Sequence, residues 1–156
     1  MSSFLYMREV AVGYQERTIW VQVLTTLVAL GVYIPWTIAA GTTEGGEWLW
    51  RMMWVIGGSV ALSVTASTVW NMAAGITRAD AKPDERDIRI SHASERVGTA
   101  FLVIAGLVAI VLCAQAVSPF WIAHTIAAGF ALSSLVGGLA ALGMYHEGIP
   151  TWAEVR

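Results

Sequence analysis

The sequence has little charge, and the charge that is present lies outside its long apolar stretches. Asp, Glu, Lys and Arg make up 13% of the 156 residues, about half the share in a soluble domain, whereas 56% are hydrophobic. Crossing a bilayer takes roughly 20 mostly apolar residues. Four segments meet this requirement, at about 18–40, 48–75, 97–117 and 121–145. Because backbone groups in lipid must bond to one another, we expect an all-α fold, an integral membrane four-helix bundle formed by a single domain over 1–156.

Cysteine and histidine are too scarce for several kinds of site. The single cysteine, Cys113, lies inside an apolar run and has no partner for an intramolecular disulfide. The three histidines are expected at different depths, His124 near one surface and His92 and His146 near the other, so they cannot share one metal. The sequence also lacks the HExxH, CxxC, Walker and GxSxG patterns. We therefore expect no catalytic residue, no metal site and no cofactor.

Three further absences narrow the interpretation. No carboxylate lies inside a predicted span, whereas small four-span drug/proton antiporters normally carry one. No basic face accompanies the net charge of −2, so a direct nucleic-acid partner is not expected. The N-terminal residues lack the basic start and the cleavage site of a signal peptide, so we expect the first span to act as the insertion signal and to remain in the mature protein.

The nine Lys and Arg residues predict the topology. Eight of them precede the first span, lie between the second and third spans, or end the chain: Arg8, Arg17, Arg78, Lys82, Arg86, Arg89, Arg96 and Arg156. The connections 41–47 and 118–120 contain none, and Arg51 can extend from the second span to that opposite surface. Because cytoplasmic loops are rich in Lys and Arg, we expect two hairpins in the inner (cytoplasmic) membrane, with both termini and the charged segment 76–96 in the cytoplasm, an N-in/C-in topology.

Aromatic residues cluster near the ends of the predicted spans. They are Trp20, Trp36, Trp48, Trp50, Trp70, Trp121 and Tyr145. The separation between Trp20 and Trp36 corresponds to about 24 Å along a helix, which suits the two edges of a hydrocarbon core of roughly 30 Å. These positions favour interfacial belts over the alternative of an aromatic ligand cage.

Two stripes of small or polar residues recur at a spacing of four, which places each stripe on one helix face. They are Ser59, Ser63, Ser67 and Asn71 in the second span, and Gly129, Ser133, Gly137 and Ala141 in the fourth. Small residues let helix backbones approach closely in a membrane. We therefore interpret the stripes as packing surfaces, within the protomer or in a homodimer or higher homo-oligomer, with a polar pathway as the alternative.

His124 is the intramembrane polar candidate. It lies near the outer end of the fourth span, one turn after Trp121, and apart from Arg51 it is the one ionisable group well within the predicted spans. Ionisable residues inside a membrane are functional candidates by default. The shallow position of His124 favours a simpler role, in which its ring caps a loop or bonds a carbonyl group.

The densest charge lies in residues 82–98, KPDERDIRISHASERVG. Pro83 suits the first position of a helix, and Glu85 is spaced for an ion pair with Arg89. Ile90, Ala93 and Val97 share one helix face. We expect an amphipathic helix over 84–96, continuous with the third span or bent onto the membrane surface.

Three interpretations of this charged segment stay open. It is a positive-inside anchor, or a docking site for a cytoplasmic protein, or an acid–base site built on His92 or Asp87. The candidate docking residues are Asp84, Glu85, Arg86, Asp87 and Arg89. Anchoring in the membrane explains the arginines but not the carboxylates. The carboxylates need another role, as a helix cap, in an internal ion pair or in contact with a partner. Catalysis needs positioned groups beside a pocket, which solvated charges do not supply.

The chain resembles a family of small four-span bacterial and archaeal membrane proteins catalogued as a domain of unknown function. The resemblance covers about residues 50–148 and is carried by Asp84-Glu85-Arg86-Asp87, by the ISHASERVG that follows, and by the ending Tyr145-His146-Glu147-Gly148. Family members often have basic residues between that Tyr and Gly, where this chain has His146 and Glu147. The resemblance implies four helices and no established activity. In some relatives the gene neighbours a helix-turn-helix regulator, which implies a membrane partner for a transcription factor.

The sequence therefore predicts a non-enzymatic membrane protein that acts through helix packing, oligomerisation and the docking of a cytoplasmic partner. A small oligomeric transporter or channel is the alternative, and an enzyme acting on a lipid or cofactor is a third hypothesis.

Overall fold

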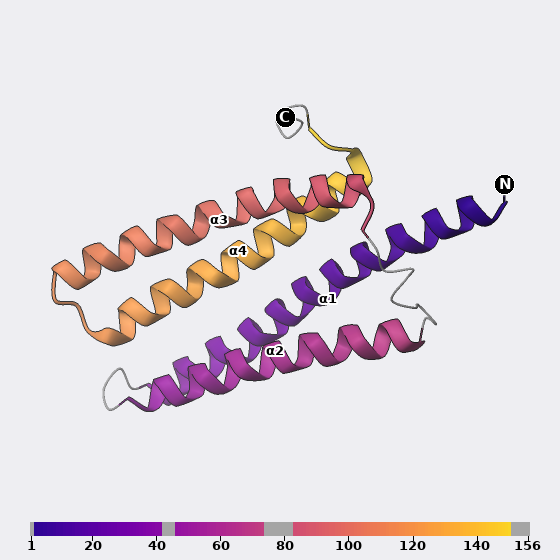
Figure 1. Ribbon diagram of the computed structural model, residues 1–156. Coiled ribbons are helices and arrows are strands. Elements are labelled where there is room, and N and C mark those ends of the chain that lie inside the picture. Colours follow the sequence, from indigo (N-terminus) through magenta and orange to yellow (C-terminus); the bar gives the residue numbers. More distant parts are fainter. Residues whose placement is uncertain (1, 42–45, 74–82, 151–156) are drawn as a thin grey trace.

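Four helices make up the computed structural model, which describes residues 2–41, 46–73 and 83–150, with the side chains of the first helix described from Gln15 onward. They are α1 (Ser2–Ala40), α2 (Glu47–Ala73), α3 (Glu85–Ala114) and α4 (Pro119–Glu147). The described residues contain no strand. Each helix includes a stretch long and apolar enough to cross a membrane. The predicted all-α, four-helix membrane fold is thereby confirmed (Figure 1).

The order of packing places α4 and α1 in the two inner positions. α4 packs most extensively on α3 and also on α1, whereas α2 packs mainly on α1 (Figure 1). Helices that follow one another in the chain form two antiparallel hairpins, α1 with α2 and α3 with α4. The contacts therefore run in the sequence α3, α4, α1, α2, and α2 is attached to the rest of the molecule chiefly through α1.

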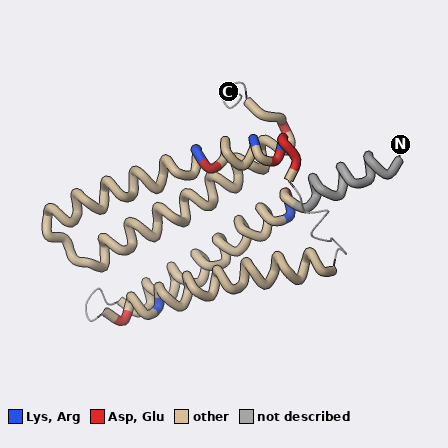
Figure 2. The backbone as a smooth tube through the Cα atoms, in the orientation of Figure 1, with Lys and Arg blue, Asp and Glu red and all other residues tan. Residues whose placement is uncertain are grey.

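Charged residues gather at one end of the bundle, which we call the charged end (Figure 2). α1 begins and α4 ends there, as the two-hairpin topology requires, and Glu47 and Arg51 lie at the opposite end, the hairpin end. Arg17, Arg86, Arg89 and Arg96 are the described cations of the charged end. Arg78, Lys82 and Arg156 lie outside the described residues, as does the side chain of Arg8.

The helix bounds differ from the predicted spans at several ends. α1 begins at Ser2 and not at residue 18, and α3 ends at Ala114 because Ala116 adopts a positive φ of 53°. Pro119 occupies the first turn of α4, two residues before the predicted start. Proline suits this position because backbone N–H groups in the first turn have no helical acceptor, so its lack of an N–H costs no hydrogen bond. α2 ends at Ala73, and the predicted extension to 75 lies outside the described residues.

The predicted small-residue stripe of α4 faces α3. It comprises Gly129, Ser133, Gly137 and Ala141. A Cβ added at Gly129 would overlap the Cβ of Ala105, and one added at Gly98 of α3 would lie 2.8 Å from the carbonyl oxygen of Ser133. Because Cβ atoms do not approach other atoms this closely, the two backbones reach their separation only with glycine at these positions. This stripe packs two helices of one protomer.

A second set of small residues, one position farther along α4, faces α1. A Cβ added at Gly138 would lie 2.5 Å from Cγ2 of Val23. One turn earlier, Ser134 accepts a hydrogen bond from Nε2 of Gln22 at 3.2 Å and shares another with Thr26 at 3.1 Å. In each of the adjacent pairs Ser133-Ser134 and Gly137-Gly138, the first residue thus faces α3 and the second faces α1. Sequence reasoning identified the first member of each pair and missed the second.

Candidate functional site

The beginning of α3 is fixed by a reciprocal cap. Asp84 is the N-cap residue, and its Oδ1 accepts a hydrogen bond from the backbone N–H of Glu85 at 2.7 Å. Asp87, in the first turn, accepts a hydrogen bond at Oδ2 from the N–H of Asp84 at 3.2 Å. This is the capping-box arrangement, in which each side chain satisfies a backbone donor of the other. The prediction that Pro83 is the first helical residue was wrong, because Asp84 caps the helix and Pro83 precedes it.

Asp87 also joins α3 to α4. Its other carboxylate oxygen, Oδ1, accepts a hydrogen bond from the hydroxyl of Tyr145 at 2.7 Å. Beside it, Nη2 of Arg86 donates to the carbonyl oxygen of Tyr145 at 3.2 Å. Only 5% of the Asp87 surface is exposed. Of the five predicted docking residues, Asp84 and Asp87 are therefore occupied within the chain, and Arg86 has one bond to α4.

The remaining candidates, Glu85 and Arg89, are exposed but do not form the expected ion pair. Nε of Arg89 instead donates to the backbone carbonyl oxygen of Glu85 at 3.4 Å. Among the described residues, one basic and one acidic side chain lie within 4.0 Å of each other, Nε2 of His146 and Oε1 of Glu16, and they form an ion pair only when the histidine is protonated. The prediction of a Glu85–Arg89 pair was wrong, because the guanidinium bonds the helix backbone in place of the carboxylate.

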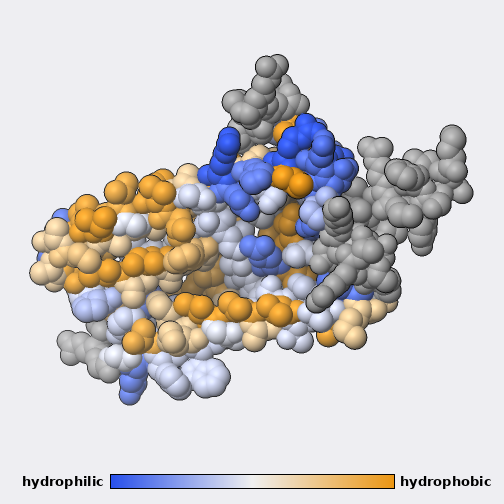
Figure 3. Space-filling view, viewed as in Figure 1, coloured by the Kyte–Doolittle hydropathy of each residue, from blue (hydrophilic) through white to orange (hydrophobic). Residues whose placement is uncertain are grey.

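The first three turns of α3 have two distinct faces. The inward face is buried and consists of Asp87, Ile90, Ala93 and Ser94. The outer face is exposed and consists of Glu85, Ile88, Arg89, His92 and Arg96. These turns continue without a break into the apolar part of α3, as one of the two predicted alternatives required. Hydrophilic residues cover this region of the surface, whereas apolar residues cover the rest of α3 (Figure 3).

A groove with polar walls lies between α1 and the inward face of α3, with α4 as its floor. We call it the polar groove; its volume is about 460 Å³. Asp87 and Glu95 line it, together with Ser91, Ser94, Thr99, Ser133, Ser134, Gln15, Gln22 and Tyr145 among its polar residues. No Lys, Arg or His belongs to its lining in the described part of the chain. Figure 3 shows the surface hollowed between the two hairpins. The sequence alone did not indicate this groove, because its residues come from three helices.

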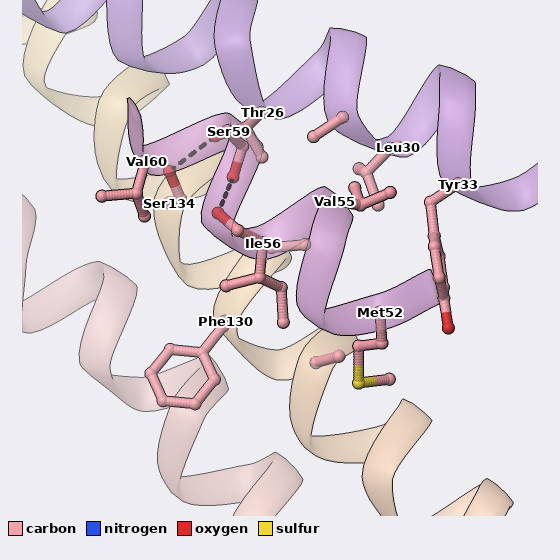
Figure 4. Close-up of a pocket in the computed structure, with 13 residues that line it drawn as sticks. Thr26, Leu30, Tyr33, Met52, Val55, Ile56, Ser59, Val60, Phe130 and Ser134 are labelled. Atoms are coloured by element: carbon pink, nitrogen blue, oxygen red, sulfur yellow. Dashed lines mark hydrogen bonds between the residues drawn. The ribbon is translucent and has the colours of Figure 1, made fainter. Parts of the chain in front are cut away.

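A second cavity of about 460 Å³ lies between α1, α2 and α4 (Figure 4). Its walls are mostly apolar, and three hydroxyl groups, those of Thr26, Ser59 and Ser134, lie near one another at one side. The predicted stripe of α2, Ser59, Ser63, Ser67 and Asn71, lies on the half-buried face of that helix. Ser59 donates its proton to the carbonyl oxygen of Ile56 at 2.8 Å, a bond within α2.

His124 lies in a cluster of aromatic rings at the hairpin end. Its Nε2 is 2.6 Å from the hydroxyl oxygen of Tyr33 and its Nδ1 is 2.6 Å from the carbonyl oxygen of Phe120. A carbonyl oxygen can only accept, so Nδ1 carries the proton, and a neutral ring then accepts the Tyr33 proton at Nε2. The bond to a carbonyl group agrees with the simpler of the two predicted roles.

Trp48 belongs to this cluster and not to an interfacial belt. Its ring packs edge-on against Phe120, with ring centroids 5.7 Å apart, and only 9% of the residue is exposed. The belt prediction was wrong for Trp48, because Trp48 and Met52 lie one turn apart on the buried face of α2. Trp50, two positions away, is 66% exposed.

The described residues include no group of three or more His, Cys, Asp or Glu side chains placed to hold a metal ion. His92 is exposed on the outer face, and both oxygens of Asp87 accept protein hydrogen bonds. Comparison with known proteins adds no assignment: no family model, curated protein or solved structure matches the chain.

Proposed function

We propose that this is a non-enzymatic, multi-pass protein of the cytoplasmic membrane that docks a cytoplasmic protein on the outer face of α3. The observation that carries this proposal is the exposure of Glu85, Arg89, His92 and Arg96 on one side of a helix whose other side is buried. The family resemblance suggests a regulator of transcription as the class of partner.

The length of α3 supports this role. Its 30 residues extend about 45 Å, whereas the hydrocarbon core is roughly 30 Å thick. The first three turns therefore project beyond the apolar layer. The Asp87–Tyr145 and Arg86–Tyr145 bonds hold them against α4, so the outer face is presented at low cost in conformational entropy.

The docking proposal is tested by exchanging charges on the outer face. The double variant Glu85→Arg/Arg89→Glu keeps the net charge and hence the topology signal, but inverts the pattern that a partner meets. A photo-crosslinking residue at position 92 should capture a defined cytoplasmic protein in the native chain, and the double variant should lose that product. The matched control is Glu16→Arg/Arg17→Glu, an exchange on α1 at the same end of the bundle. Equal capture by the native chain and the double variant would contradict the proposal.

Homo-oligomerisation is the second part of the proposal, and the exposed face of α2 supports it. Gly57, Ala61 and Thr65 are exposed at a spacing of four, and no heavy atom lies within 4 Å of a Cβ built at Gly57. This spacing of small residues is typical of close helix pairs in membranes. We therefore propose that the oligomer contact lies beside, and not on, the Ser59 stripe.

A small transporter or channel is the alternative function, favoured by the reach of the polar groove. Its polar lining residues run from Tyr145 at the charged end to Ser133 and Ser134 near the middle of α4. Beyond this depth the Tyr33–His124 cluster occupies the hairpin end. Flux of a solute into liposomes that depends on the protein, and that changes on Ser134→Val or His124→Phe, would favour this alternative over docking.

A further inference from the structure

We propose that the polar groove binds a linear primary ammonium compound, with its charged head at Glu95, in the field of the buried Asp87 carboxylate, and its chain extending toward Phe130. This inference does not depend on the docking proposal, because the groove lies on the inward side of α3 and docking uses the outer face. It rests on the shape of the groove, its charge, its hydrogen-bonding capacity and the nature of its deep end.

The groove is long enough for an extended molecule. Along its floor the lining runs from Tyr145 to Phe130 of α4. These fifteen helical steps correspond to about 22 Å. Its volume of about 460 Å³ lies within the range of small-molecule sites. A linear ligand therefore fits the groove better than a compact one.

The charge of the lining selects a cation. Asp87 and Glu95 are its charged residues; Arg86, the chain neighbour of Asp87, is outside the lining and donates to the Tyr145 carbonyl group. Asp87 is only 5% exposed, so its charge is weakly screened by water. An anionic ligand would meet two carboxylates with no compensating cation among the lining residues.

The hydrogen bonds around Asp87 and Glu95 favour a ligand that donates at this part of the lining. The Tyr145 hydroxyl donates to Asp87, that of Ser91 to Glu95 at 3.3 Å, and that of Ser94 to the backbone carbonyl oxygen of Ser91 at 2.9 Å. Each of these hydroxyl protons is thus already engaged within the protein. What these hydroxyls and the carboxylates offer a ligand is lone pairs. An ammonium group, with three N–H donors and no acceptor, matches such a lining.

Hydroxyl protons near the deep end of the groove are likewise donated to other groups of the protein. Thr26 donates its proton to the carbonyl oxygen of Gln22, so in the Thr26–Ser134 bond the proton comes from Ser134. Phe130 and Ser134 line both the polar groove and the apolar cavity of Figure 4. The deep end therefore borders on apolar walls, which suit the hydrocarbon part of the ligand and not a second charge.

Calorimetric titration of the full chain in phosphatidylcholine nanodiscs tests this inference, with empty nanodiscs correcting for partition into lipid. The probes are dodecylammonium, dodecyltrimethylammonium and dodecanol, which share a chain and differ in charge and donors. We expect saturable binding of dodecylammonium, weaker binding of the trimethyl compound, which has charge but no N–H donor, and no saturable binding of dodecanol. Glu95→Gln, at an exposed position, should weaken dodecylammonium binding about tenfold, as expected for one charged hydrogen bond.

Two further variants distinguish binding in the groove from a general attraction of cations to the charged end. Glu147→Gln removes an exposed carboxylate at the same end, outside the lining, and should leave the affinity unchanged. Thr99→Trp, at an exposed lining position, should fill the groove and abolish binding while the thermal unfolding temperature is retained. Saturation equal in empty nanodiscs, equal weakening by Glu147→Gln and Glu95→Gln, or dodecanol binding as tight as dodecylammonium would each overturn the proposal.

Discussion

The hydroxyl of Tyr145, near the end of α4, donates a hydrogen bond of 2.7 Å to Oδ1 of Asp87 in the first turn of α3. The same carboxylate caps its own helix through Oδ2. One side chain thus joins the two ends of the α3–α4 hairpin that are farthest from its turn. The hairpin is closed by a polar contact at one end and by the chain connection at the other.

Removing this hydrogen bond should destabilise the bundle. Tyr145→Phe leaves Oδ1 of a buried carboxylate without its donor, and we expect a loss of about 1–3 kcal/mol in the free energy of unfolding. Asp87→Asn leaves one acceptor oxygen, which can serve Tyr145 or the Asp84 N–H but not both, and should cost a similar amount. Thermal unfolding in detergent, followed by circular dichroism, measures both variants. Equal stability of Tyr145→Phe and the native protein would show that the hydroxyl bond contributes nothing.

Two glycines of α3 should respond oppositely to the same substitution. A Cβ at Gly98 would lie 2.8 Å from the Ser133 carbonyl oxygen, whereas a Cβ at Gly106 would have no heavy atom within 4 Å. Gly98→Ala should therefore lower the free energy of unfolding by about 1–3 kcal/mol through overpacking. Gly106→Ala should leave it unchanged or raise it by up to about 1 kcal/mol, the gain in helix propensity. Parallel unfolding curves of the two variants provide the comparison; a stabilising Gly98→Ala would contradict the α3–α4 packing.

Trp48 and Trp50 should differ in the same way on α2. Trp48 is 9% exposed and packs on Phe120, whereas Trp50 is 66% exposed. We expect Trp48→Ala to cost about 3–5 kcal/mol, the usual loss for a buried aromatic ring. Trp50→Ala should change the stability far less. Chemical denaturation followed by the remaining tryptophan fluorescence separates the two, and a larger loss for Trp50→Ala would show that the assignment of faces is reversed.

The free face of α2 provides a test of oligomerisation. Gly57→Leu places a large side chain on the exposed small-residue stripe, where it should prevent close approach of a second copy and lower the oligomer fraction. Gly31→Leu is the matched control, since a Cβ at Gly31 of α1 also has no heavy atom within 4 Å. Native mass spectrometry from nanodiscs measures the fraction. Loss of the oligomer in both variants alike would count against α2 as the interface.

The sequence predicted the features that depend on single-helix patterns. Long apolar runs indicated four helices, and their number and type are confirmed. The spacing of Ile90, Ala93 and Val97 predicted the buried face at the start of α3; Ile90 and Ala93 are buried and Val97 is half-buried. These inferences need only the periodicity of a single helix, which can be recognised in the sequence of one segment.

Features that depend on which helices are neighbours were not predictable in this way. Trp48 was placed in a belt because its position near a span end is the same whether it faces lipid or protein. The contacts of Ser134 and Gly138 with α1 were missed because they exist only where α4 packs on a second helix besides α3. The polar groove collects side chains from α1, α3 and α4, and no spacing within one helix indicates such a set.

The position of α4 between α3 and α1 has a consequence for biosynthesis. Domains are made from the N-terminus onward, so α1, α2 and α3 enter the membrane before the helix on which α1 and α3 both pack. Until α4 is inserted, α3 lacks its main neighbour, and Val23 of α1 lacks the Gly138 surface. The last helix made therefore unites the two halves, and an interruption of translation before Pro119 would leave inserted helices with no common core.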